Sequence, residues 1–118
     1  MRCFLKTIDL AHIIVDELID KKGENIILLD VHEITSFTDF FIICTGTSNR
    51  MLNALADCII TKTKDLCSWK IRVDGKPDSG WVVLDFGTIL VHLLDEELRR
   101  YYNLEDLWKA GKIVIRMQ

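Results

Sequence analysis

Two short, unbroken apolar runs constrain the fold of this chain more than any other feature: IILL at residues 26–29 and FFIIC at residues 40–44. Both are far shorter than the roughly 20 residues that a membrane-spanning helix needs. Their β-branched and aromatic residues favour strands, and a strand that is apolar at every position is typical of a sheet covered on both faces. We therefore expect buried strands over residues 25–31 and 40–44.

Amphipathic helices are expected before the first strand and after the second. Apolar residues recur at three- and four-residue spacing over residues 8–22 and again over residues 49–64, as on the buried side of a helix. Gly23, which follows a cationic last turn, is expected to end the first helix in the left-handed conformation. Ser48 is the expected N-cap of the second helix, because its hydroxyl can accept a hydrogen bond from a free amide.

Shorter elements complete the predicted sheet. They are strands at 69–73, 81–85 and 89–94, a turn-rich connection at 74–80, a tight hairpin turn at 86–88, a helical turn at 95–100, a short helix at 104–109, and either an edge strand or a frayed tail at 112–117. This order predicts an α/β (α+β-like) protein with one mixed sheet of about five strands and helices packed on its faces.

The bulk composition predicts a single cytoplasmic domain. The 118 residues contain no linker, repeat or low-complexity segment, and 49% of them are hydrophobic, enough for a core without metal or disulfide bonds. The four cysteines have no C-x-x-C or zinc-finger spacing, and Cys44 and Cys58 are interpreted as buried, reduced thiols. No signal peptide is expected, because the first residues run directly into the first helix.

The formal net charge of −3 argues against a nucleic-acid-binding protein. Proteins that hold nucleic acid by its phosphates usually carry a basic excess, so we expect little direct binding to nucleic acid. An acidic protein is better matched to a basic protein surface. Lys62, Lys64, Lys70 and Arg72 could form a local basic patch, but we interpret them as solvated positions at a helix end and an edge strand.

The turn TGTSNR at residues 45–50 is the strongest candidate for chemistry. Gly46 could let backbone amides approach a phosphate at the helix start, or it could serve the geometry of the turn alone. A nucleotidyltransferase would follow such a turn with two carboxylates one residue apart on a strand, which hold Mg²⁺. Asp57 instead has Ile59 two residues on and lies in an expected helix, so the carboxylate pair is missing.

The histidines do not form a catalytic set. His12, His32 and His92 are scattered, and a histidine within a strand is more often a hydrogen-bonded packing residue than a ligand. His92 with Asp95 and Glu96 could be imagined as a metal or acid–base cluster. No serine or cysteine nucleophile has a histidine at an identifiable spacing. We expect no catalytic residue, no metal site and no cofactor, and hence a protein that is not an enzyme.

Aromatic residues and acids gather in the last third of the chain. Period-two alternation places Trp81, Val83 and Asp85 on one face of their strand. A carboxylate on the same face as a tryptophan indicates that this face is not wholly buried, and tryptophan is enriched at the centres of protein interfaces. The alternative is that Trp81 fills the core.

Several segments match one known family in combination. They are LDV (29–31), TDFFIICTGTSNR (38–50), AD (56–57), Gly75, WVVLDFG (81–87), VH (91–92), Glu97, Arg99 with YY (101–102), and LEDLW (104–108). With them the sequence resembles the ribosomal silencing factor family, also called the Iojap family, over residues 10–108. The resemblance implies a nucleotidyltransferase-like fold without its catalytic carboxylates, and a single domain over 1–118 in which residues 109–118 are a C-terminal extension of unknown role.

The resemblance also implies a function. Members bind ribosomal protein L-fourteen on the large ribosomal subunit, sterically block association with the small subunit and repress translation under nutrient limitation; homodimers are common off the ribosome. Two alternatives stay open, a factor for assembly of the large subunit and a nucleotide-binding transferase.

The family's partner-binding surface maps onto six positions of this sequence. They are Trp81, Phe86, His92, Leu94, Glu97 and Asp74, the last standing where the family often has glutamate. Two positions depart from the family pattern: Thr88 stands where an aspartate is frequent, and Met51 where polar residues are usual. Loss of a carboxylate at the rim of an interface is expected to change the association rate and its salt dependence more than the fold.

Overall fold

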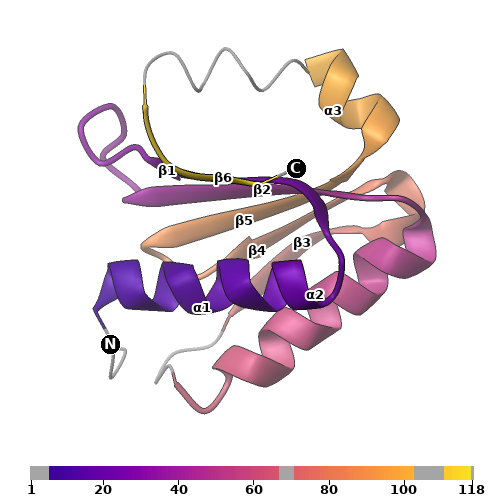
Figure 1. Cartoon of the computed structure of the whole chain (residues 1–118), viewed down its shortest axis with the longest axis horizontal. Coiled ribbons are helices and arrows are strands. Elements are labelled where there is room, and N and C mark those ends of the chain that lie inside the picture. The colour runs from indigo at the N-terminus through magenta and orange to yellow at the C-terminus, as the bar shows by residue number, and fades with distance from the viewer. Residues whose placement is uncertain (1–5, 67–70, 103–110, 118) are drawn as a thin grey trace.

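The computed structural model describes residues 6–66, 71–102 and 111–117. Its elements are, in chain order, α1 (Thr7–Asp20), β1 (Glu24–Asp30), β2 (Phe40–Gly46), α2 (Asn49–Thr63), β3 (Arg72–Lys76), a 3₁₀ turn (Pro77–Ser79), β4 (Trp81–Asp85), β5 (Ile89–Asp95), α3 (Glu96–Tyr102) and β6 (Lys112–Met117). The strands form one mixed sheet in the order β3-β4-β5-β2-β1-β6 (Figure 1). The central pair, β2 with β5, is parallel, and the other four neighbouring pairs are antiparallel.

The α/β class and the mixed sheet are thus confirmed, but the sheet has six strands rather than about five. The sixth strand is β6, which pairs antiparallel with β1 from Ile26↔Met117 to Asp30↔Lys112. Of the two interpretations of residues 112–117, the edge strand is therefore the correct one. The helix expected at residues 104–109 lies outside the described residues.

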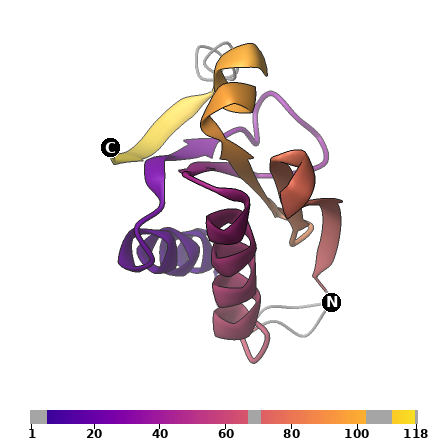
Figure 2. The ribbon, with the colours of Figure 1, turned by 90° about the vertical axis from the view of Figure 1, so that its right-hand side faces the viewer.

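Two apolar layers sandwich the sheet. Helices α1 and α2 pack against one face and against each other, while α3 lies beyond the opposite face (Figure 1, Figure 2). The helix-covered face holds the larger core cluster, which includes Leu10 and Ile14 from α1, Leu52 from α2, and Val91 from β5. The opposite face holds a second cluster of Ile27, Leu29, Val31, Phe41, Ile43 and Leu94, against which Trp81, Leu90 and Leu98 pack.

The unbroken apolar runs of the sequence follow from these two layers. Along β1, Ile26 and Leu28 belong to the helix-side cluster, whereas Ile27 and Leu29 belong to the opposite one. All four side chains are at most 2% exposed. Because both faces of β1 and β2 are buried along these two runs, every position in the runs is apolar, as the sequence predicted.

The end of α1 differs from the expectation in one detail. Lys22, not Gly23, adopts the left-handed conformation, with φ of 65°. The amide of Lys22 donates to the carbonyl of Ile19 and that of Gly23 to the carbonyl of Leu18, the double hydrogen bond of a Schellman motif. The last turn of α1 itself contains no basic residue, since both lysines follow it.

Gly23 is required for a different reason, the close approach of Cys44. A Cβ atom added at Gly23 would lie 2.4 Å from the Sγ atom of Cys44, which is fully buried on β2. The glycine therefore lets the chain leaving α1 pass directly over the central strand.

Of the strand predicted at residues 69–73, residues 69–70 lie outside the described residues, and the observed strand β3 runs from Arg72 to Lys76. The sequence DGK at residues 74–76 predicts a turn, but it continues the strand opposite β4, with Gly75↔Val82 in register. Gly75 adopts φ of 82°, and a Cβ there would lie 2.2 Å from the carbonyl oxygen of Trp81. A glycine that usually marks a turn is used here for close backbone approach inside a strand.

We predict that Gly23→Ala lowers the free energy of unfolding by about 1–3 kcal/mol, because the new methyl group overlaps Cys44 in a close-packed core. Cys44→Ala removes the overlapping sulfur, so Gly23→Ala should cost much less in that background. The four proteins of this double-mutant cycle can be compared by urea denaturation. Strictly additive losses would contradict the proposed contact.

Candidate functional site

The pairing of β4 with β5 places a set of side chains on the sheet face opposite α1 and α2. The residues directly opposite each other are Trp81↔Leu94, Val83↔His92 and Asp85↔Leu90. The intervening Val82 and Leu84 point to the helix-side core. We call the half-buried residues Trp81, Val83, Asp85, Leu90 and His92 the β4–β5 face.

An aromatic row crosses this face. The imidazole of His92 lies between the indole of Trp81 on β4 and the ring of Phe41 on β2, at centroid distances of 6.1 Å and 5.5 Å. The Phe41–His92 contact is edge-to-face, with the planes at 85°. Nε1 of Trp81 donates a hydrogen bond to Nδ1 of His92 at 3.4 Å.

His92 is a neutral hydrogen-bond acceptor in this row. Burial lowers its pKa from 6.5 to about 4, because desolvation disfavours the imidazolium ion. An indole N–H can only donate, so Nδ1 of His92 must be unprotonated, and we assign the proton of the neutral ring to Nε2. The sequence-based interpretation of His92 as a hydrogen-bonded packing residue agrees with this geometry.

The edge strand β3 extends the face with alternating charges. Register places Arg72 opposite Asp85, Asp74 opposite Val83, and Lys76 opposite Trp81, so these three exposed side chains share the face. Asp74 is therefore one strand removed from Val83 and two from His92. Its two basic neighbours make the rim mixed in charge rather than purely acidic.

Helix α3 adds acids at the end of the face nearest Trp81. The amide of Asp95 donates to the carbonyl of Gly80, and Oδ1 of Asp95 accepts from the amide of Leu98 at 2.8 Å, which caps the helix. Glu96 and Glu97 are exposed in the first turn. Gly80, with φ of 82°, makes room for this arrangement, since a Cβ atom there would lie 2.2 Å from Asp95 Oδ2.

Arg99 fixes α3 to the central strands. Its guanidinium donates to the hydroxyl of Thr45 at 2.7 Å and to the carbonyl of Asn25. The contact joins residues more than fifty positions apart in the sequence. The orientation of Glu97 relative to the β4–β5 face therefore depends on Arg99.

Four of the six predicted partner-binding residues lie on or beside this face, and the side chains of the other two are buried. Trp81 and His92 are half-buried on the face, while Asp74 and Glu97 are exposed at its rim. Phe86 is 0% exposed and belongs to the helix-side core, because alternation after Val82 and Leu84 carries it under α1 and α2.

Leu94 is also 0% exposed, although it belongs to the correct side of the sheet. It lies in the second cluster, where Trp81 and Leu98 pack against it. Phe86 and Leu94 are therefore core residues that support the surface from within, and we remove both from the predicted contact set.

The turn after β2 is explained by packing and capping. Ser48 Oγ accepts a hydrogen bond from the amide of Met51 at 3.1 Å, as predicted for an N-cap. A Cβ atom at Gly46 would lie 2.7 Å from Cδ2 of the buried Leu52, so the glycine allows α2 to start close to the sheet. Asp57 is exposed on α2 and Ile59 is fully buried, so these two positions form no carboxylate pair and do not lie on a strand.

No metal centre is found among the described residues, where no group of three or more histidine, cysteine or acidic side chains could hold an ion. None of the helices in the same part of the chain is long and apolar enough to span a membrane. Cys44 is a buried free thiol whose pKa is raised to about 12, mainly by desolvation. Such a thiol is unreactive at neutral pH.

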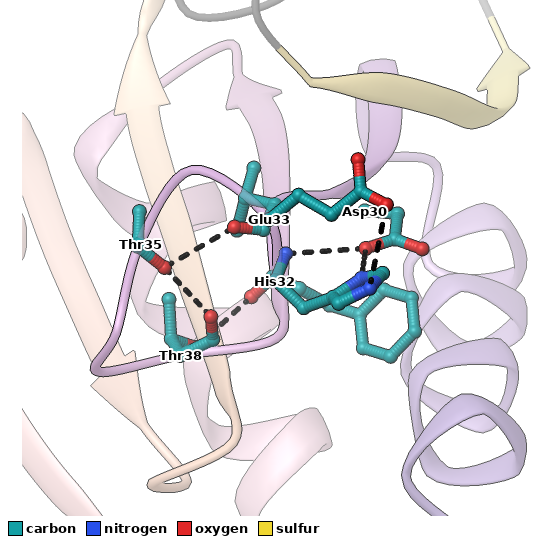
Figure 3. Close-up of polar contacts among 7 residues, drawn as sticks. Asp30, His32, Glu33, Thr35 and Thr38 are labelled. Carbon is teal, nitrogen blue, oxygen red and sulfur yellow. Dashed lines mark hydrogen bonds and ion pairs between the residues drawn. The ribbon is translucent and has the colours of Figure 1, made fainter.

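Sequence reasoning missed an ionic contact after β1. Nδ1 of His32 lies 2.5 Å from Oδ1 of Asp30, which also accepts from the amide of His32 at 3.2 Å (Figure 3). This hydrogen bond, with the Asp30 charge, raises the pKa of His32 and lowers that of Asp30. The two-residue separation of Asp30 and His32 is a sequence signal for such a local hydrogen bond.

The same segment is tied to the β4–β5 hairpin. The hydroxyl of Thr35 donates to the carbonyls of Thr38 and Val31 (Figure 3), and the amide of Asp39 donates to the carbonyl of Thr88 at 2.9 Å. Ile34 and Phe37 remain 43% and 67% exposed on this segment.

A second missed feature is an open groove of about 300 Å³ between α1 and α2, lined by Glu17, Lys21, Asp57, Cys58, Thr61 and Lys62.

Comparison with known proteins identifies the family. The family model described as "Ribosomal silencing factor during starvation" matches residues 5–117. The chain belongs to the ribosomal silencing factor family. Ribosomal silencing factor RsfS of Haemophilus influenzae is 38% identical over 99 residues, which cover 84% of this chain and 97% of that protein.

Solved structures support the same assignment. A crystal structure of a protein from Chromobacterium violaceum superposes with a TM-score of 0.82 at 32% identity, and covers 94% of both chains. A mouse relative, "Mitochondrial assembly of ribosomal large subunit protein 1", is 33% identical over 98 residues, which cover 80% of this chain and 43% of that protein. The family match runs through β6, so residues 109–117 lie inside the matched range.

We predict that Asp30→Asn destabilises the protein more near pH 5.5 than near pH 9. The raised pKa of His32 contributes stability below its ordinary value of 6.5, which is lost as the pH rises through the raised folded value. The lowered pKa of Asp30 contributes stability at pH values above 3.8, its ordinary pKa, and this stability is lost as the pH falls through the lowered folded value. The ion pair therefore stabilises the folded protein mainly between the two ordinary pKa values, 3.8 and 6.5. Urea denaturation of the wild type and the variant near pH 5.5 and near pH 9 measures the difference.

Glu33→Gln is the matched control, because Glu33 is 3.9 Å from the His32 ring and affects its pKa less than Asp30 does. It should leave the pH dependence nearly unchanged. An equal loss of stability in Asp30→Asn at both pH values would show that the ion pair does not contribute as described.

Proposed function

We propose that this protein silences ribosomes by binding the large ribosomal subunit through ribosomal protein L-fourteen, where it sterically blocks association with the small subunit. Translation is thereby repressed when nutrients are limiting. Membership of the family supports the ribosomal role. The observation that carries the docking surface is the half-buried Trp81 on the β4–β5 face, with the exposed carboxylates of Asp74 and Glu97 at its rim.

The composition of this face suits a protein partner. A tryptophan that keeps part of its indole exposed gives up little conformational entropy on binding and buries a large area, which is why tryptophan dominates interface hot spots. The supporting layer below Trp81, formed by Leu94 and Leu98, is fixed before a partner arrives. Preorganisation of this kind reduces the entropic cost of association.

Charge supports a basic partner. The protein has a formal net charge of −3, and the acids Glu96 and Glu97 extend from α3 beside Trp81. A basic ribosomal protein would be attracted to this end of the face. The rim on β3 is mixed in charge, because Arg72 and Lys76 flank Asp74, whereas two acids are adjacent in the first turn of α3.

A binding role without catalysis is part of this proposal. The turn that resembles a transferase is accounted for by the Ser48 cap and by the contact of Gly46 with Leu52. Relatives carry names that describe a regulator, not a transferase. The protein would act in the cytoplasm, where ribosomal subunits assemble into active ribosomes, and without a cofactor.

A homodimer off the ribosome is a further part of the proposal. The edge strand β6 carries the exposed apolar side chains Ile113, Val114 and Met117, which are 42–47% exposed. A strand at the end of the described sheet that carries apolar side chains is a suitable surface for a second copy.

Assembly of the large subunit is the second candidate. The name of the mouse relative refers to that process in mitochondria. An assembly factor would bind precursor particles in preference to mature large subunits, whereas a silencing factor binds mature subunits. Binding to the two kinds of particle, measured side by side, distinguishes the two roles.

We predict that the protein co-sediments with purified large subunits and that Trp81→Ala raises the Kd at least about thirtyfold, the effect of losing an interface hot spot of about 2 kcal/mol. Glu97→Lys should weaken binding most at low salt, because an exposed charge acts mainly through long-range attraction. Binding can be quantified by pelleting at two salt concentrations.

Asp16→Lys is the matched charge reversal, since Asp16 is exposed on α1 and lies on the opposite side of the sheet. It should bind like the wild type. If Trp81→Ala and Glu97→Lys also bind like the wild type, the proposed surface is wrong; if the wild type does not co-sediment at all, the proposed function is wrong.

A further inference from the structure

We propose that His92 is the positioning residue for Trp81: as a neutral imidazole with its proton on Nε2, it accepts the indole N–H and holds the ring in the orientation that a partner meets. The inference rests on the proposed function for its consequence in binding. Its structural part concerns the free protein alone.

The geometry assigns this role to His92, which contacts the indole of Trp81 both through its ring and through a hydrogen bond. His92 lies on the strand between Trp81 and Phe41, and it contacts both rings. The hydrogen bond from Nε1 of Trp81 to Nδ1 of His92 joins residues eleven positions apart, on neighbouring strands. Phe41 is only 7% exposed, so it is a fixed surface against which the imidazole ring packs.

Charged groups around His92 do not disturb its neutral state. Register places Val83 of β4 and Ile43 of β2 beside it, both apolar. The charged residues of the neighbouring elements on this side of the sheet are Asp85 on β4, Arg72, Asp74 and Lys76 on β3, and Glu96, Glu97 and Arg99 on α3. Desolvation by burial lowers the pKa of His92 to about 4. The ring therefore stays neutral at neutral pH.

The identity of the residue matters because only some side chains can accept at this point. Leucine fills a similar volume but offers no acceptor to the indole N–H. Asparagine is smaller, yet its Oδ1 can occupy a position near that of Nδ1. The two substitutions therefore separate the hydrogen bond from simple filling of the space.

The first test uses the free protein. Long-range ¹H–¹⁵N spectra should show His92 in the Nε2–H tautomer, unchanged between about pH 7 and pH 5, as its lowered pKa requires. The indole N–H of Trp81 should exchange with solvent more slowly in the wild type and in His92→Asn than in His92→Leu. An Nδ1–H tautomer, or equal exchange in the three proteins, would overturn the proposal whether or not the protein binds ribosomes.

The second test measures binding to purified large subunits. His92→Leu should raise the Kd about tenfold, equivalent to one hydrogen bond, and His92→Asn should recover most of that loss. In a Trp81→Phe background, which lacks the indole donor, the two His92 variants should bind equally. A persistent difference between them in that background would show that His92 acts independently of Trp81.

The two tests also distinguish this inference from the proposed function. Absence of binding by the wild type would reject the proposed function and leave the tautomer and exchange results to decide the positioning role. Wild-type binding with no difference between the Leu and Asn variants would reject the positioning role alone.

Discussion

The parallel pairing of β2 with β5 is the interaction on which the rest of the structure depends. It runs in unbroken register from Phe40↔Ile89 to Gly46↔Asp95 at the centre of the sheet. Because the strands are parallel, their carboxyl ends lie side by side at one end of the sheet. Helices α2 and α3 both start there. The alternation of β5 then sends Val91 to the helices and His92 to the opposite face.

The candidate surface follows from that division of the sheet. One face is occupied by α1 and α2, so the residues that remain for a partner lie on the other face and at its rim. The row of Phe41, His92 and Trp81 crosses three adjacent strands there, and each ring is supported by the next. Burial of the middle ring, which keeps it neutral, is thus a consequence of the same layering that positions the outermost one.

Much of the fold could be predicted because local chemistry and tertiary packing agree. The bounds of β4, the Ser48 cap and the buried apolar runs of β1 and β2 follow from alternation, capping and composition. The errors occurred where a residue serves a distant contact. Gly75 suggests a turn in the sequence, yet it is a strand glycine that allows the Trp81 backbone to approach.

The candidate site was predicted only in part, for the same reason. Trp81 and His92 were singled out, but the hydrogen bond between them depends on strand register, which the sequence does not specify. Phe86 belongs to a recognisable motif, and its burial follows from the period-two alternation with Val82 and Leu84 that the sequence already contained. Leu94 required knowledge of α3, since Leu98 packs in the cluster that buries it.

The measurement that tests the account most directly is subunit joining in sucrose gradients. Purified large subunits are incubated with increasing amounts of the protein before small subunits are added. The account predicts that the fraction of joined ribosomes falls as the protein saturates the large subunit, and that the protein migrates with free large subunits. Unchanged joining while the protein is bound to the large subunit would contradict the account.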